Sequence, residues 1–65
     1  MPTIKITGMS CNHCVASVTK TLNEIVGIKN VQVDLKQGQA TYDEEKPVSI
    51  ETIRAAISAI GFGVE

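Results

Sequence analysis

The 65-residue chain has few aromatic residues and no long apolar run. It has no Trp, one Tyr and one Phe, which leaves little surface on which nucleic acid bases could stack. The formal net charge is −1, and the six Lys and Arg residues are scattered singly, so no basic patch is expected. No apolar run approaches the roughly 18 residues of a membrane-spanning helix. We therefore expect neither nucleic acid binding nor membrane insertion.

The chain also lacks a recognisable secretory signal. Its N-terminus, residues 1–5, has no long apolar segment, which favours a cytoplasmic location; a precursor already trimmed of its signal is the alternative. Cytoplasmic thiols are kept reduced. Two cysteines in that compartment therefore more often bind a metal or do redox chemistry than stabilise the fold through a disulfide.

The first third of the chain predicts a strand followed by a helix. Ile4 and Ile6 alternate with polar residues, which is typical of a half-buried strand, and Gly8 ends this pattern. From Cys14 onward, apolar residues recur on one face of a helix, at Val18, Leu22 and Ile25.

The middle of the chain predicts two further strands. Apolar residues of the first alternate with polar ones, at Val31, Val33 and Leu35. Residues 36–39 then form a tight turn, in which Gly38 can supply a positive φ. Ala40 and Tyr42 are the expected inward residues of a short third strand, and residues 43–47 a polar loop.

A second helix and a short strand over residues 62–65 complete the pattern. The helix is predicted by isoleucines at helical spacing, all expected in the core: Ile50, Ile53, Ile57 and Ile60. The resulting order is βαββαβ. It predicts one α+β domain over residues 1–65 with the ferredoxin-like arrangement, in which two helices cover one face of a four-stranded antiparallel sheet.

Polar residues and glycines mark the ends of the predicted helices. Ser10 or Asn12 is the expected N-cap of the first helix, and Gly27 its end. Ser49 is the expected N-cap of the second helix, which Gly61 terminates.

The only two cysteines and the only histidine lie within four consecutive residues. Cys11 is expected at the end of the first strand, and Cys14 in the first turn of the helix. The unpaired N–H groups and the positive dipole of a helix N-terminus favour a thiolate. Two thiols at this spacing can share one soft metal ion or close a disulfide.

The number of ligands favours Cu(I) over Zn(II). A structural Zn(II) site uses four ligands, whereas this chain offers two thiols and one imidazole. Cu(I) accepts two thiolates in near-linear coordination and stays open to a third. We expect His13 to be a neighbour of the site rather than a ligand, and Met9 to pack beneath the loop.

Residues 8–14, Gly-Met-Ser-Cys-Asn-His-Cys, resemble the GMxCxxC signature of the heavy-metal-associated (HMA) domain family, and especially its small bacterial copper chaperones. The resemblance covers essentially the whole chain. It implies that Cys11 and Cys14 hold one Cu(I) per monomer. It also implies a metallochaperone, not an enzyme, that delivers copper by thiolate exchange to a copper-transporting P-type ATPase. The expected state is a monomer, with a copper-bridged dimer as the alternative.

Other functions stay open at this point. ATPase-attached domains of the family often have Phe at the position of Phe62, where bacterial chaperones often have Tyr, so the runner-up is an excised N-terminal ATPase domain. Met1 and the end of the chain soon after the last strand favour the free protein.

A relative that binds Hg(II) or Zn(II) is a further alternative, although zinc-handling domains often carry Asp in place of Ser10. From another class, a thiol–disulfide oxidoreductase also places CxxC at a helix N-terminus. Phe62 is expected to pack at the core edge or to limit solvent access to the metal.

Overall fold

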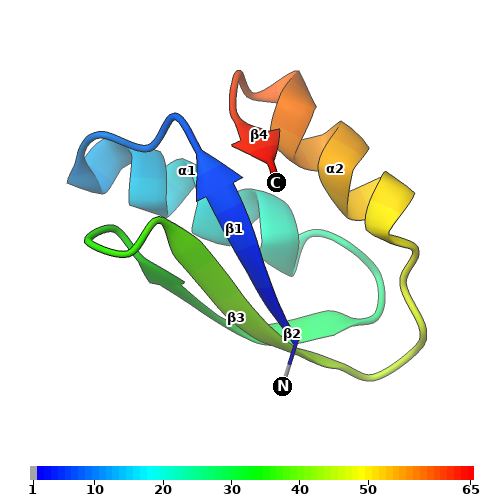
Figure 1. The fold of residues 1–65 in the computed structure, drawn as a ribbon. Coiled ribbons are helices and arrows are strands. Elements are labelled where there is room, and N and C mark those ends of the chain that lie inside the picture. The colour runs from blue at the N-terminus through cyan, green and yellow to red at the C-terminus, as the bar shows by residue number, and fades with distance from the viewer. Residues whose placement is uncertain (1) are drawn as a thin grey trace.

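The computed structural model describes residues 2–65. Met1, which was part of the argument for a free protein rather than an ATPase domain, lies outside the described residues. The elements follow one another as β1 (Thr3–Thr7), α1 (Asn12–Asn23), β2 (Ile28–Asp34), β3 (Gln39–Glu44), α2 (Ile50–Ala59) and β4 (Gly63–Val64) (Figure 1). This is the predicted βαββαβ order, and the prediction of an α+β, ferredoxin-like fold is confirmed.

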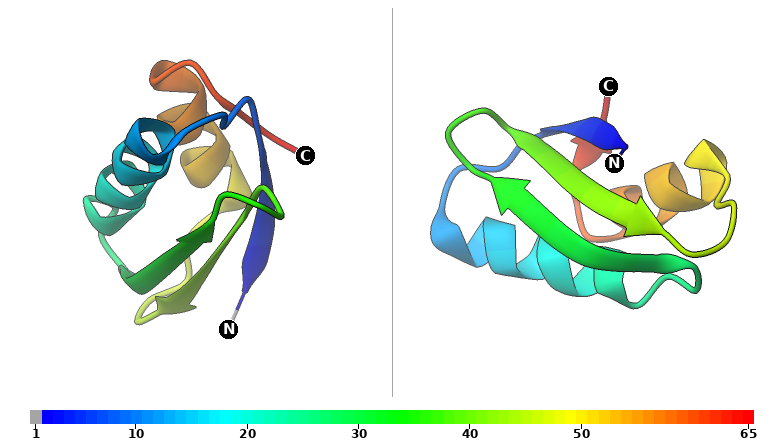
Figure 2. Two further views of the ribbon diagram at one scale, coloured as in Figure 1. Left: turned by 90° about the vertical axis from the view of Figure 1, so that its left-hand side faces the viewer. Right: turned by 90° about the horizontal axis from the view of Figure 1, so that it is seen from below.

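The four strands form one sheet in the order β2-β3-β1-β4, and all neighbouring pairs are antiparallel. Both helices cover the same face of this sheet (Figure 2). Strand β1 therefore lies inside the sheet, with β3 on one side and β4 on the other. Its last residue, Thr7, pairs with Gly63, so the loop that carries the cysteines leaves from a strand that is held on both sides.

The core lies between the helices and the covered face of the sheet. It consists of nine buried residues from five of the six elements: Ile4, Ile6, Val18, Leu22, Ile28, Ala40, Tyr42, Ile53 and Ile57. Burying each large aliphatic side chain contributes about 1.5–3 kcal/mol. The inward orientation of Ala40 and Tyr42 is thus confirmed.

The prediction that all four isoleucines of α2 belong to the core is wrong for two of them. Ile53 and Ile57 are buried, but Ile50 is 43% exposed and Ile60 is 38% exposed. These two residues stand at the start of α2 and at its C-cap, beyond the turns that pack over the sheet.

The predicted ends of the first helix are also wrong. Neither Ser10 nor Asn12 is the N-cap: that position belongs to Cys11, whose side chain makes no capping hydrogen bond. The helix ends at Asn23, well before Gly27, which instead turns the chain into β2 with φ +100°. Cys11 is the N-cap because the loop holds its backbone extended directly before the first helical residue. The preference of Ser and Asn side chains for this position does not decide it here.

Strand boundaries in the middle of the chain differ from the prediction as well. Strand β2 begins at Ile28 and leaves Leu35 in the turn. The pairing with β3 shifts register near Asn30, which has φ 55°. This shift interrupts the alternation of apolar and polar residues, so the sequence pattern did not indicate the first residues of the strand. Residues 43–44 belong to β3 rather than to the polar loop, and β4 is only two residues long. The turn before β3 has the expected positive φ, 64°, at Gly38.

The N-cap of α2 gives a direct test of these assignments. Ser49 caps α2 as predicted, because its hydroxyl accepts the N–H of Glu51 at 3.2 Å. Ser49→Ala should therefore lower the free energy of unfolding by about 1 kcal/mol, measured by urea denaturation. Ser10→Ala is the matched control and should have a much smaller effect, because Ser10 caps no helix. Equal losses in the two variants would contradict the cap assignment.

Candidate metal centre

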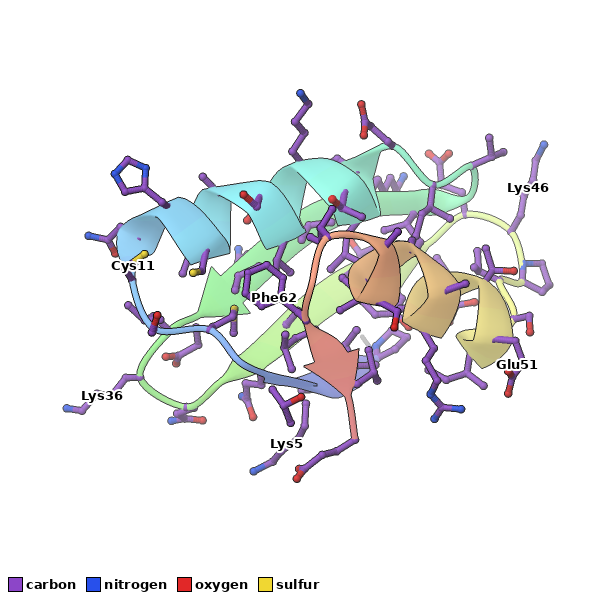
Figure 3. All side chains as sticks on the ribbon, turned by 90° about the horizontal axis from the view of Figure 1, so that it is seen from above. Lys5, Cys11, Lys36, Lys46, Glu51 and Phe62 are labelled. Atoms are coloured by element: carbon purple, nitrogen blue, oxygen red, sulfur yellow. The ribbon has the colours of Figure 1, made fainter. Side chains whose placement is uncertain are left out.

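Cys11 and Cys14 lie where β1 passes into α1. Gly8, with φ +95°, turns the chain out of the strand. Cys11 has an extended backbone, and its carbonyl accepts the N–H groups of Cys14 at 3.0 Å and Val15 at 3.2 Å. Cys14 therefore stands in the first turn of the helix, as predicted. Figure 3 shows Cys11 at the open N-terminal end of α1.

The two sulfur atoms are 3.5 Å apart. A disulfide bond is about 2.05 Å long, so both thiols are free. A thiolate–metal bond is about 2.3 Å in zinc sites, and a linear ion with similar bonds needs sulfurs about 4.6 Å apart. The pair would have to open by about 1 Å, and the exposed side chain of Cys11 has room to do so. The geometry fits one soft ion bound by two thiolates.

The loop favours the charged form of Cys14. A hydrogen bond from the backbone of Ser10 is the largest cause that holds the pKa of this thiol below its usual value, and the Cys11 thiol is the next. Partial burial opposes both of them. A lower pKa gives more thiolate at neutral pH, which is the form that binds metal. The sequence pattern predicted from the helix terminus that the pKa is lowered, but it gave no sign of the contribution of Ser10, which acts mainly through its backbone.

The other candidate residues, His13, Met9 and Phe62, differ in how they lie relative to the core. His13 is exposed, and nowhere in residues 2–65 do three or more Cys, His, Asp or Glu side chains gather to hold an ion. Met9 is half-buried and packs against the core, as predicted. Phe62 does the same, and its ring also lies beside Gly8. The role of Gly8 in this contact was not predicted, and its only signal was that a glycine is the first residue of the GMxCxxC motif.

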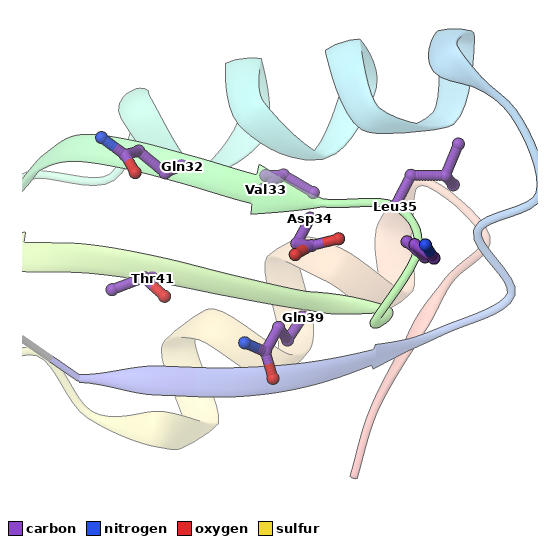
Figure 4. Close-up of a pocket in the computed structure, with 7 residues that line it drawn as sticks. Gln32, Val33, Asp34, Leu35, Gln39 and Thr41 are labelled. Atoms are coloured by element: carbon purple, nitrogen blue, oxygen red, sulfur yellow. The ribbon is translucent and has the colours of Figure 1, made fainter.

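The rest of the surface offers no competing centre within the described residues. An open depression on the sheet (Figure 4) has one carboxylate, one ammonium and no thiol or imidazole in its lining, which consists of Gln32, Val33, Asp34, Leu35, Lys36, Gln39 and Thr41. No helix between residues 2 and 65 is both long and apolar enough to cross a bilayer.

The sequence profile of the heavy-metal-associated domain family matches residues 3–63. The chain belongs to this family. It is 39% identical over 61 residues to the copper chaperone CopZ of Enterococcus hirae, covering 92% of this chain and 88% of the relative. It is 35% identical over 63 residues to a probable copper-exporting P-type ATPase of Archaeoglobus fulgidus, covering 95% of this chain but 8% of the ATPase. Among solved structures, a CopZ metallochaperone matches with a TM-score of 0.87 and 31% identity, covering 98% of this chain and 97% of the other.

The family resemblance read from residues 8–14 is thereby confirmed, including the similarity to small bacterial copper chaperones. That Cys11 and Cys14 are metal ligands stays a prediction.

The lowered pKa of Cys14 predicts a pH profile for its alkylation. Because the pKa is lower in the folded protein than in the unfolded chain, the rate of reaction with iodoacetamide should reach half its maximum at a lower pH in native protein than in urea. Peptide mapping by mass spectrometry separates Cys14 from Cys11. By linkage, the thiolate stabilises the fold above the unfolded pKa, and this stabilisation is lost as pH falls through the folded pKa. Equal midpoints in the two states would contradict the assignment.

Proposed function

We propose that this protein is a metallochaperone for Cu(I). Cys11 and Cys14 hold one Cu(I) per monomer, and the whole chain, residues 1–65, acts as one metal-binding domain. The observation that carries the proposal is the pair of free thiols, 3.5 Å apart at an open helix N-terminus. The ion is cargo that the protein passes on, and no covalent catalysis is involved.

The donor set supports Cu(I) as the cargo. Thiolates are soft ligands and select soft ions such as Cu(I). A closed Zn(II) site would need two further ligands, and the described part of the chain gathers no third acidic, imidazole or thiol group around the pair. The names of the relatives, copper chaperone and probable copper-exporting ATPase, point to the same metal.

Exposure of the site supports delivery by ligand exchange. An ion held by only two sulfurs at the surface has room for an incoming thiolate of the acceptor. That thiolate forms a third bond, one of the original bonds then breaks, and a second exchange completes the transfer. Each bond that is lost is replaced, so the ion is never free in solution. Cys11 is the more exposed of the two ligands and is the one that an acceptor reaches first.

The acceptor that we propose is a metal-binding domain of a copper-transporting P-type ATPase. The chain is similar to a chaperone over 88% of the chaperone's length and to a segment that makes up 8% of an ATPase. This supports the choice, because a donor and an acceptor domain with the same fold can each offer a similar pair of thiolates to the ion. The role implies a cytoplasmic location, where thiols stay reduced.

Copper transfer to such a domain tests the proposal. Protein loaded with one Cu(I) is mixed, without oxygen, with an ATPase domain that carries its own CxxC motif, and the two are separated and assayed for copper. Copper should divide between them, because the thiolate pairs are chemically alike. The control is the same domain with both cysteines changed to serine, which should take none. Retention of all copper by the loaded protein in both mixtures would overturn the proposed delivery.

A further inference from the structure

Strand β2 is the one long free edge of the sheet within residues 2–65. It pairs only with β3 and is seven residues long, whereas β4 at the opposite edge has two residues (Figure 2). Outside the pairing with β3, its only backbone hydrogen bond in this part of the chain runs from the N–H of Ile28 to the carbonyl of Ile25 at 3.1 Å. The unpaired N–H and C=O groups of such an edge can pair with another chain.

A bulge interrupts this edge. Two residues of β2, Asn30 and Val31, lie opposite one residue of β3, Tyr42. Asn30 is the extra residue, because it follows the exposed Lys29 and is itself exposed, in a strand that otherwise alternates between the core and solvent. Its backbone has φ 55°, which Asn tolerates better than most residues, and its side-chain amide donates to the Asp43 carboxylate at 2.8 Å. Such a bulge bends the strand, and bulges are common at sheet edges.

Without Asn30, the edge would alternate regularly along its whole length. Apolar side chains at Ile28, Val31 and Val33 face the core, and the residues between them are exposed. β-Branched residues at every second position favour an extended strand. The shortened edge would therefore be a regular strand with nothing paired to its outer side.

The shortened edge would also complement a second copy of itself. Two such edges can pair antiparallel about a two-fold axis at Gln32. Val31 of one copy then lies opposite Val33 of the other, on the face that meets the core. Lys29 lies opposite Asp34 on the exposed face, and the symmetry repeats this pair. Opposite charges directly across two strands stabilise their pairing. In the native chain, the extra residue of the bulge takes the place of Lys29 in this register.

We propose that the free edge of β2 is a self-association surface for a second copy of this chain, and that the bulge at Asn30 keeps it closed. Pairing would join two four-stranded sheets into one, and it would stop at a dimer because β4 is too short to extend the sheet further. For a carrier this protection matters, because each transfer brings together two domains of one fold, and edge pairing would hold them together. That consequence rests on the proposed function, whereas the self-pairing does not.

The test deletes Asn30 and measures the molar mass by sedimentation equilibrium. Metal-free protein is used with a chelator and a reductant, so that neither copper nor a disulfide can join two copies. The native chain should stay monomeric, and the deletion variant should form a dimer. Asn30→Gly is the matched control: it keeps the extra residue, and glycine adopts φ 55° freely, so this variant should stay monomeric.

A second variant keeps the chain length, in case the deletion variant does not fold, which circular dichroism shows. In Asn30→Val, a β-branched residue disfavours φ 55° and so loosens the bulge. This variant should dimerise more weakly than the deletion variant. A monomeric state in Asn30→Val and in a folded deletion variant would overturn the proposal, and so would an equally strong dimer of Asn30→Gly.

Charge reversal tests the register of the dimer. In the deletion variant, Lys29→Glu would place two carboxylates opposite each other in both symmetric pairs, so the dissociation constant of the dimer should rise about tenfold. Adding Asp34→Lys restores the opposite charges and should return the constant close to its earlier value. Lys46→Glu makes the same change in net charge outside β2 and should leave the constant unchanged. A dimer that does not respond to the reversal at Lys29 would contradict the proposed pairing. If the native protein binds no Cu(I), the proposed function fails, while these masses still decide the role of the bulge.

Discussion

Two thiols have to lie within reach of one ion at the surface with no covalent bond between them, so the backbone alone has to bring them together, and their sulfurs are 3.5 Å apart. It does so at the passage from β1 into α1. Strand β1 is fixed by partners on both sides, and the first turn of α1 is fixed by the hydrogen bonds that the Cys11 carbonyl accepts. Only the short segment from Gly8 to Cys11 is left to be placed. The position of both sulfurs depends on that segment.

Under the proposed function, the same arrangement balances holding an ion against giving it up. The lowered pKa of Cys14 favours binding, because it supplies thiolate at neutral pH. Exposure of Cys11 and the absence of a third ligand from the described residues favour release, because an acceptor can approach the ion. A site closed by four ligands would bind more firmly and exchange more slowly. The small core can remain intact during transfer, because neither cysteine belongs to it.

Much of the fold was predictable from local patterns, and the errors have local causes. The alternation at Ile4 and Ile6 and the helical spacing at Val18 and Leu22 were sufficient to place β1 and α1. The apolar face of each element packs into the same core, so its residues follow the period of that element. The start of β2 was missed because the bulge near Asn30 breaks the period. Within the site, the placement of the cysteines followed from their position between a strand and a helix. The contact between Phe62 and Gly8 could not be predicted, because it joins residues that only the pairing of β1 with β4 brings together.

The central claim is that Cys11 and Cys14 together bind one Cu(I), and a competition titration against a chromogenic Cu(I) chelator under reducing conditions tests it most directly. The native protein should take one Cu(I) per monomer. Cys11→Ser and Cys14→Ser should each lower the affinity by more than about 100-fold, since loss of a mere outer partner of a ligand already costs 10–100-fold. His13→Ala is the control and should stay close to native. Native affinity in a variant that lacks both cysteines would contradict the account.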